Sequence, residues 1–183
     1  LGGHMLEWVS KHIGFAKHLR ELRFKQWMNR NAAAILVQAG VGAGQTALDF
    51  GCGSGTYTIP TAKLVGEDGL VYALDIDKTA LEKVERKAKL EGLKNILTID
   101  SSAGEAIPLK NESLDHVFLI DVLQDIAAKS ALLDEVRRVL KPNGVATVFP
   151  MHLDMEAVKS LTIERGFALE RILHERVLVF KRI

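Results

Sequence analysis

The stretch Ala47-Leu48-Asp49-Phe50-Gly51-Cys52-Gly53-Ser54-Gly55 decides the fold, because an apolar run ends here in three alternating glycines. The run from Thr46 to Phe50 is short and nearly all apolar, as expected of a strand buried on both faces. The glycines permit a sharp turn and leave backbone N–H groups open to a ligand, since no Cβ intrudes. Nucleotides bind at such a turn in an open parallel sheet, although a lone glycine triplet also occurs in plain loops.

Helix and strand patterns alternate from residue 31 to the end of the chain. Apolar runs between turn residues predict strands at 46–50, 70–74, 95–99, 116–120, 145–149, 167–173 and 176–181. Between them, apolar residues at helical spacing predict helices at 31–39, 57–65, 78–91, 125–140 and 155–165. This alternation is typical of an α/β domain with a mostly parallel sheet.

Asp75 follows the second predicted strand, roughly 20 residues after the glycine turn, where nucleotide-binding domains carry an acidic residue. A carboxylate at this place accepts hydrogen bonds from ribose hydroxyls. A turn residue or a helix cap is the alternative, but the pairing with the glycine turn favours a nucleotide site. Thr56 stands where the dinucleotide fingerprint G-x-G-x-x-G ends in glycine or alanine, which disfavours NAD.

The glycines at 51, 53 and 55 form a G-x-G-x-G pattern that resembles motif I of the class I S-adenosylmethionine-dependent methyltransferases. Further segments resemble this family in order: YALDID at 72–77, EAIPL at 105–109 with NESLD at 111–115, and LDEVRRVLKPNG at 133–144. The most similar branch is the ubiquinone/menaquinone-biosynthesis-like general methyltransferase domain. The resemblance implies an α/β three-layer sandwich whose seven-stranded, mostly parallel sheet has the order 3-2-1-4-5-7-6, with strand 7 antiparallel.

The resemblance also implies that S-adenosylmethionine is the cofactor and S-adenosylhomocysteine the product. The implied cofactor-binding residues lie on the loops that follow the first four strands, namely Asp49, Gly51, Cys52, Gly53, Gly55, Asp75, Ile76, Ser102, Ala103 and Asp121. Gly51, Cys52 and Gly53 would lie against the methionine part, Asp75 on the ribose and Ile76 beside the adenine. Many relatives carry an acidic residue where this chain has Ser102. We therefore expect Ser102 or a backbone carbonyl to accept from the adenine amino group, through a neutral hydrogen bond.

Other polar side chains have a structural interpretation beside the functional one. Cys52 stands between two glycines, which favours a small space-filling residue over a nucleophile. Asp121 ends the fourth strand and is either a site carboxylate or a helix cap. His152, after the fifth strand, is a candidate base, but no catalytic residue is assigned. The histidines show no spacing typical of a metal site, and His116 in a strand indicates a structural role.

The N-terminal region lies outside the alternating pattern. Residues 1–4 look like the remnant of an expression tag before an initiator Met5, and residues 5–30 form a helical segment ahead of a methyltransferase domain at 31–183. Relatives usually carry an insertion after the fifth strand that walls the acceptor pocket, but here only residues 151–154 are available. The aromatic surface of residues 6–28, Trp27 included, therefore predicts a lid over the cofactor or a segment that packs across a homodimer.

Composition limits the classes of function. The 183 residues fit one domain, and a net charge of +1 gives no strong field toward nucleic acid. The single cysteine, together with the lack of any apolar run near the ~20 residues of a membrane span, predicts a soluble cytoplasmic protein. The sequence favours a methyltransferase that acts on a small molecule. The alternatives are a methylase of a protein or RNA and a cofactor-binding module without catalysis. In-line methyl transfer needs alignment more than a base, so the sequence identifies a cofactor but no catalytic residue.

Overall fold

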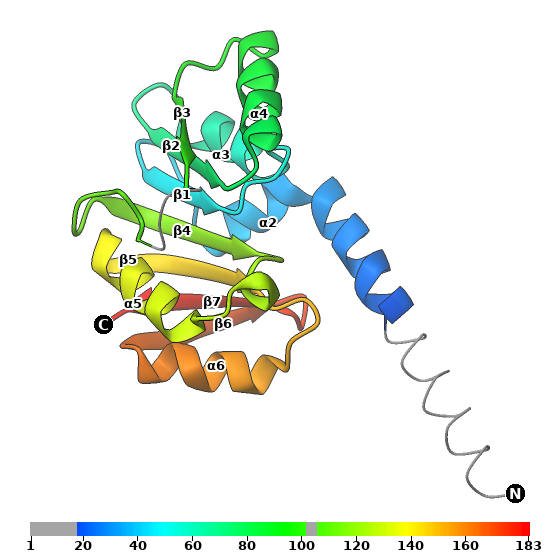
Figure 1. The fold of residues 1–183 in the computed structure, drawn as a ribbon, viewed down its shortest axis with the longest axis vertical. Coiled ribbons are helices and arrows are strands. Elements are labelled where there is room, and N and C mark those ends of the chain that lie inside the picture. The colour runs from blue at the N-terminus through cyan, green and yellow to red at the C-terminus, as the bar shows by residue number, and fades with distance from the viewer. Residues whose placement is uncertain (1–17, 102–105) are drawn as a thin grey trace, which may run out of the picture. The chain divides into compact units, whose positions relative to one another are not determined.

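The computed structural model describes residues 18–101 and 106–183 (Figure 1). The expected tag remnant at 1–4, the first part of the expected lid, and Ser102 and Ala103 lie outside these residues. Contacts divide the chain into two units, Leu1–Asn31 and Ala32–Ile183. In the first unit, residues 18–30 form a helix on which the rings of Phe24 and Trp27 lie 5.6 Å apart.

The second unit is built on a seven-stranded sheet of order β3-β2-β1-β4-β5-β7-β6. In chain order its strands are β1 (Thr46–Phe50), β2 (Leu70–Asp75), β3 (Ile96–Asp100), β4 (Leu114–Ile120), β5 (Leu140–Phe149), β6 (Phe167–Leu173) and β7 (Val177–Arg182). Strands β1 to β5 pair in parallel, whereas β7 is antiparallel to both β5 and β6. The strand order and the antiparallel seventh strand implied by the family resemblance are confirmed.

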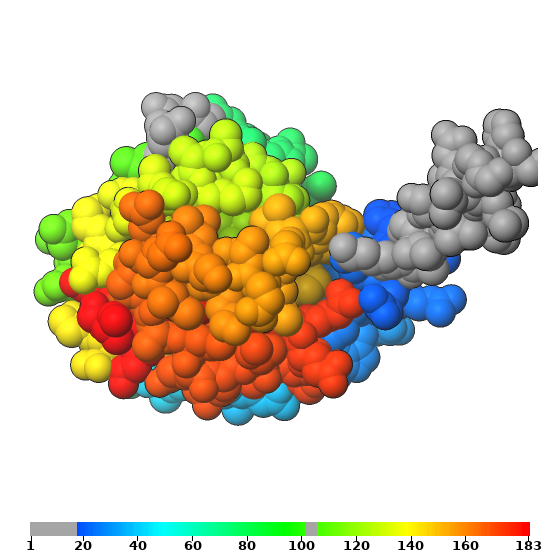
Figure 2. Space-filling view, turned by 90° about the horizontal axis from the view of Figure 1, so that it is seen from below, coloured from blue at the N-terminus to red at the C-terminus, as the bar shows by residue number. Residues whose placement is uncertain are grey.

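Helices cover both faces of this sheet, since the strand order runs outward from β1 to β3 and then restarts at β4 in the opposite direction. The helices are α2 (Ala32–Ala39), α3 (Thr58–Val65), α4 (Lys78–Leu90), α5 (Lys129–Val139) and α6 (Met155–Glu164). Helix α3 contacts both α2 and α4, whereas α5 contacts α6. Figure 2 shows the face on which α6 lies, in orange. None of the described helices combines the length and apolarity needed to cross a bilayer.

The core lies where the central strands meet these helices. On β1 and β4, Leu48, Val117 and Leu119 are fully buried. Helix α5 contributes its apolar face to the same cluster, with Leu133 and Val136 among its members. Each such side chain stabilises the fold by roughly 1.5–3 kcal/mol, so the central strands hold their carboxyl ends in fixed positions.

The helix predicted from Asp125 begins later, and that prediction is wrong by one turn. A 3₁₀ turn, η1, spans Leu123–Asp125, and α5 starts at Lys129. No side chain caps the start of α5, and its buried apolar positions begin only at Leu132, so burial rather than capping fixes the helix. Residues 126–128 therefore stay non-helical and are available to line a site.

The fifth strand also differs from its predicted start at Val145. Strand β5 begins at Leu140, which pairs with Leu114 across an irregularity in the register. Asn143 adopts φ +65°, a left-handed conformation that asparagine tolerates better than most residues. The Lys141-Pro142-Asn143-Gly144 sequence thus ends the helix, as predicted, but lies within an interrupted strand.

Candidate functional site

A cavity of about 430 Å³ lies at the carboxyl ends of β1, β2 and β4. Its volume is within the roughly 300–1,000 Å³ of small-molecule sites. Of the predicted cofactor residues, Gly51, Asp75, Ile76 and Asp121 line it. Asp125 adds a third carboxylate, and among the described lining residues there is no lysine, arginine or histidine. The cavity is therefore apolar and acidic, which suits a ligand with positive charge.

The glycine turn closes the cavity where β1 ends. The Gly51 N–H donates to the carbonyl of Leu74 over 2.8 Å, which ties the turn to β2. Gly51 adopts φ +75°, and a Cβ there would lie 2.7 Å from the Val122 Cγ2 atom. Only glycine satisfies both the conformation and the close approach of the loop after β4. The backbone is thus brought directly to the cavity wall.

Asp75 is the last residue of β2, and backbone donors fix its carboxylate. Oδ2 accepts from the Gly53 N–H over 2.8 Å, and Oδ1 accepts from the Asp77 N–H over 3.0 Å. A carboxylate oxygen has two acceptor sites, so each can take a further hydrogen bond from a ligand. Asp75 therefore organises the turn and presents acceptors to the cavity, so the two interpretations of this residue are compatible.

Asp49 lies buried on β1 and does not line the cavity. Its Oδ2 accepts from the Thr58 hydroxyl over 2.6 Å, which joins β1 to the first residue of α3. Burial raises the pKa of Asp49 to about 6, although the hydrogen bonds from Thr58 oppose the shift. Asp49 therefore stabilises the glycine turn through its buried contact with α3, and not by a position in the cavity lining.

Cys52, Gly53 and Gly55 belong to the same turn but are not among the lining residues. The side chain of Cys52 packs in a core cluster with Leu81 and Val84, and burial raises the pKa of its thiol. A neutral, packed thiol is a poor nucleophile, so Cys52 fills space and offers only its backbone to a ligand. Ile76, by contrast, is 73% exposed at the rim, where it offers an apolar surface.

Asp121 ends β4 with φ +55° and lines the cavity. Its N–H donates to the carbonyl of Phe149 over 3.1 Å, which extends the parallel ladder to β5. The Gln124 side-chain amide donates to both the carbonyl and Oδ1 of Asp121, at 2.8 Å each. The helix-cap alternative does not hold, because α5 starts at Lys129. No motif in the sequence indicates that Gln124 fixes the Asp121 carboxylate.

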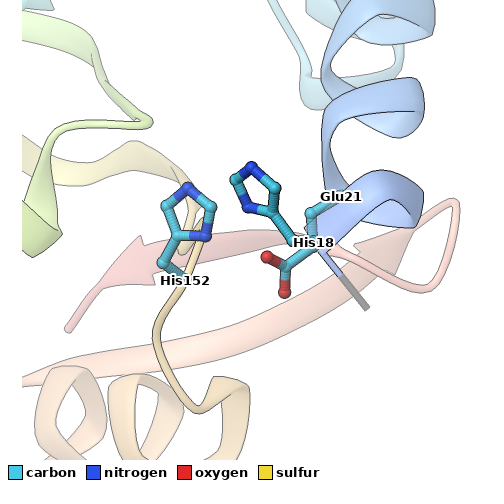
Figure 3. Close-up of side chains that lie close together, drawn as sticks. All are labelled: His18, Glu21 and His152. Atoms are coloured by element: carbon cyan, nitrogen blue, oxygen red, sulfur yellow. The ribbon is translucent and has the colours of Figure 1, made fainter. Parts of the chain in front are cut away.

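The histidines divide into a structural and an exposed group. His116 is fully buried, with Nε2 2.8 Å from the Thr147 hydroxyl and its ring stacked on Phe118. Burial lowers its pKa to about 3, so it stays neutral, and the structural role expected for it is confirmed. Figure 3 places His152, the candidate base, on the loop after β5, where its φ is +65°; it does not line the cavity. His18 and Glu21, also labelled there, belong to the helix over residues 18–30.

The residues of the cavity wall opposite the glycine turn were not predicted from the sequence. They are Ala106, residues 125–128, and Ala131 and Leu132 on α5. Alanines belong to no binding motif and bear no charge, so these lining residues could not be recognised. Residues 126–128 also fit the helical pattern of the sequence, although they are not helical. One usable signal was the absence of a capping side chain before Lys129.

A profile of the methyltransferase-domain family matches residues 42–165, which include the glycine turn and the whole cavity lining. The demethylmenaquinone methyltransferase of Geobacillus stearothermophilus is 32% identical over 137 residues, covering 75% of this chain and 54% of that protein. The chain thus spans about half the length of the curated relatives it matches.

Solved structures share the fold. A SAM dependent methyltransferase from Aquifex aeolicus has a TM-score of 0.74 at 23% identity, over 82% of this chain and 88% of that chain. The cyclase SpnF has a TM-score of 0.67 at 17% identity, over 80% and 60%. At such identities the likeness shows the fold alone, and a cyclase among the neighbours illustrates that one fold serves several activities. On the family profile, the chain belongs to the methyltransferase-domain family, and the resemblance to the class I S-adenosylmethionine-dependent methyltransferases is confirmed.

Proposed function

We propose that the chain binds S-adenosylmethionine and transfers its methyl group to a small-molecule acceptor. One observation carries the proposal: the Asp75 carboxylate is held at the cavity by the Gly53 and Asp77 N–H groups, with acceptor sites left on both oxygens. Two adjacent ribose hydroxyls match two such oxygens. Family membership and the fold of the Aquifex aeolicus enzyme support the same activity.

The cavity fits the charge and shape of this cofactor. S-adenosylmethionine carries a sulfonium, an ammonium and a carboxylate, so its net charge is positive, and Asp75, Asp121 and Asp125 are the charged groups among the described lining residues. The exposed side chain of Ile76 offers an apolar face to the adenine ring. Gly51 adds no side chain to the cavity, and the side chain of Cys52 packs in a core cluster outside the lining, so neither takes up the space of the methionine part.

When bound, S-adenosylmethionine supplies an activated methyl group on its sulfonium. The residues of the chain then have to bind the cofactor, align its methyl group with the acceptor and keep water away from the site. Asp75 fixes the ribose, Asp121 presents a carboxylate held by Gln124, and the apolar wall excludes water. Holding the nucleophile and the methyl carbon at about 3–3.5 Å is worth as much as ~7–11 kcal/mol, so alignment is the main contribution. No general base is assigned, and His152 remains a candidate.

Calorimetry and thermal shift with S-adenosylmethionine, S-adenosylhomocysteine and NAD test the cofactor directly. We expect micromolar binding of the two adenosyl ligands and none of NAD. S-adenosylhomocysteine at 100 times its Kd should add about 2.7 kcal/mol to the free energy of unfolding. An acceptor screen with labelled methyl donor follows. Binding of NAD without binding of S-adenosylhomocysteine would refute the proposal.

A second candidate function is methylation of a macromolecule, a protein or an RNA. The connection from β5 to α6 spans only residues 150–154, so little of the chain walls the acceptor side there. Incubation with labelled donor and a mixture of cellular proteins and RNA separates the two acceptor classes. Label in macromolecules, with none in small molecules, would favour this candidate. Binding of the cofactor without any transfer would instead indicate a binding module.

The lid, the homodimer and the cytoplasmic location stay proposals. Aromatic residues on the N-terminal helix support the lid, and the single cysteine supports a reducing compartment. Hydrogen exchange with and without S-adenosylhomocysteine tests the lid, which predicts slower exchange of residues 18–28 when the ligand is bound. Sedimentation of the full chain tests the dimer. Equal exchange in both states would leave the helix without a lid function.

A further inference from the structure

Arg138 on α5 binds residues 107–111, in the segment between β3 and β4. Nη1 donates to the carbonyl of Leu109 over 2.9 Å and to the Asn111 side chain over 2.7 Å. Nη2 donates to the carbonyl of Ile107 over 2.8 Å. Nε and Nη2 also donate to the two carboxylate oxygens of Glu135, both over 2.7 Å. These are five hydrogen bonds from one side chain, as many as a guanidinium has N–H groups.

Glu135 completes the arrangement from the same helix. Its Oε2 accepts from the Ile107 N–H over 2.9 Å, so the pair satisfies both backbone groups of that residue. Ile107 is 2% exposed and packs in the main core cluster. A buried peptide needs partners for its N–H and its carbonyl. Here Glu135 accepts from the N–H, while the carbonyl accepts from Arg138 and, over 2.7 Å, from the Leu109 N–H.

The held loop and the helix are also two parts of the cavity wall. Ala106, the neighbour of Ile107, lines the cavity, as does Ala131 of α5. Ala131, Glu135 and Arg138 are spaced i, i+4 and i+7, so they share one face of α5. The same helix face therefore lines the cavity at one end and fixes the opposing loop at the other.

We propose that Arg138 and Glu135 are positioning residues that set the distance between Ala106 and α5, and thereby the affinity of the cavity for the adenosyl part of the cofactor. The inference rests on the proposed function. The pair does not touch the ligand; it acts through the loop that it holds.

Geometry rather than charge attraction makes this pair effective. The two side chains are 31% and 25% exposed, and exposed ion pairs contribute little to stability. Lysine cannot reproduce the planar set of donors of a guanidinium, because its ammonium has only three N–H groups, which rotate together about one bond. Arg138→Lys should therefore loosen residues 107–111 while the buried leucines and valines keep α5 folded.

The test compares Arg138→Lys with two controls by calorimetry with S-adenosylhomocysteine and by thermal unfolding. Arg137→Lys is the neighbour control, since Arg137 makes one long hydrogen bond of 3.3 Å to the Ile183 carbonyl. Arg182→Lys is the stability control, because Arg182 contacts Glu112 over 2.9 Å and the Leu140 carbonyl, and none of these residues lines the cavity. We expect a Kd about tenfold higher for Arg138→Lys and unchanged values for both controls.

A merely structural role would lower the Tm of Arg138→Lys and Arg182→Lys alike without moving the Kd of either. That result would overturn the inference. If Arg138→Lys does not fold, Glu135→Gln decides in the same way, since it keeps the shape of the side chain but leaves one acceptor oxygen, which cannot serve the Arg138 Nε–H and the Ile107 N–H together. Wild-type protein that fails to bind S-adenosylhomocysteine would refute the proposed function instead, so the two failures are distinguishable.

Discussion

The two sides of the cavity are built by different means. The glycine turn and Asp75 form one side through backbone conformation and backbone hydrogen bonds, within residues 49–77. The opposite side, from Ala106 to Leu132, depends on side-chain hydrogen bonds: Gln124 fixes Asp121 nearby, and Arg138 and Glu135 hold Ile107 from positions far along the chain. A site assembled from local backbone geometry leaves a motif in the sequence. A site held by long-range side-chain hydrogen bonds does not.

Gly51→Ala should break the glycine side most severely. The substitution places a Cβ 2.7 Å from Val122 and imposes a φ of +75° on alanine. Strain and overpacking together should cost roughly 2–5 kcal/mol of unfolding free energy, and binding of S-adenosylhomocysteine should be lost. Chemical denaturation and calorimetry measure both effects.

A matched control for that substitution is Gly42→Ala, where a Cβ meets nothing within 4 Å. Val122→Ala in the Gly51→Ala background should restore part of the stability, because it removes the contact at 2.7 Å but neither the tight contact of 3.2 Å with the Cβ atom of residue 122 nor the backbone strain. Full restoration would show that conformation plays no part at this glycine.

The free energy of unfolding should depend on pH through Asp49, the buried residue next to the glycine turn. Burial raises the pKa of Asp49 in the folded protein to about 6, above the ordinary value of an aspartate. Its contribution is therefore present at pH 4 and is lost as pH rises through about 6, amounting to roughly 3 kcal/mol. Buried His116 acts in the opposite sense, so the measurement must compare wild type with Asp49→Asn at each pH. A difference between the two proteins that stays constant from pH 4 to 7 would contradict the assignment.

Asp75→Asn should weaken S-adenosylhomocysteine binding by about 10–100-fold, the value of ~1.5–3 kcal/mol for hydrogen bonds to a charged group. The amide keeps the shape of the side chain but turns a donor toward Gly53 or Asp77, both of which are donors already. Asp77→Asn is the control, since Asp77 caps α4 through the Thr79 N–H and does not line the cavity. Unchanged affinity in Asp75→Asn would leave the ribose with another partner.

Gln124→Met on the opposite side should have the smallest effect. It removes the two 2.8 Å hydrogen bonds that fix Asp121, each worth ~0.5–1.5 kcal/mol, and should raise the Kd about three- to tenfold. Gln38→Met, whose hydrogen bond goes to His174 and which does not line the cavity, should leave the Kd unchanged. An effect as large as that of Asp75→Asn would mean that both sides of the cavity bind the ligand equally.

Most of the fold could be predicted, because burial and turn residues repeat along the chain. The predicted bounds of β1 (Thr46–Phe50) and β6 (Phe167–Leu173) match those observed. The starts of α5 and β5 did not, because tertiary packing and pairing with Leu114 fix them rather than local pattern.

The site divides in the same way. Asp75 and the glycines could be found by spacing alone, and Asp121 by its place after a strand. The contacts of Arg138 with Ile107 and Leu109 join residues 31 and 29 positions apart, so no local pattern announces them. Residues 126–128 of the cavity lining could not be recognised in the sequence, because Ile-Ala-Ala is equally compatible with the start of a helix.

The three carboxylates around the cavity have a consequence for ionic strength. With no lysine, arginine or histidine among the described lining residues, no basic side chain of the cavity lining offsets their mutual repulsion. A bound cation relieves it, and so do salt ions, whose screening acts over ~8 Å at physiological strength. Salt therefore weakens the electrostatic attraction between the carboxylates and a cationic ligand. We expect the affinity of the chain for S-adenosylmethionine to fall as salt rises, and that for an uncharged ligand of the same shape to change less.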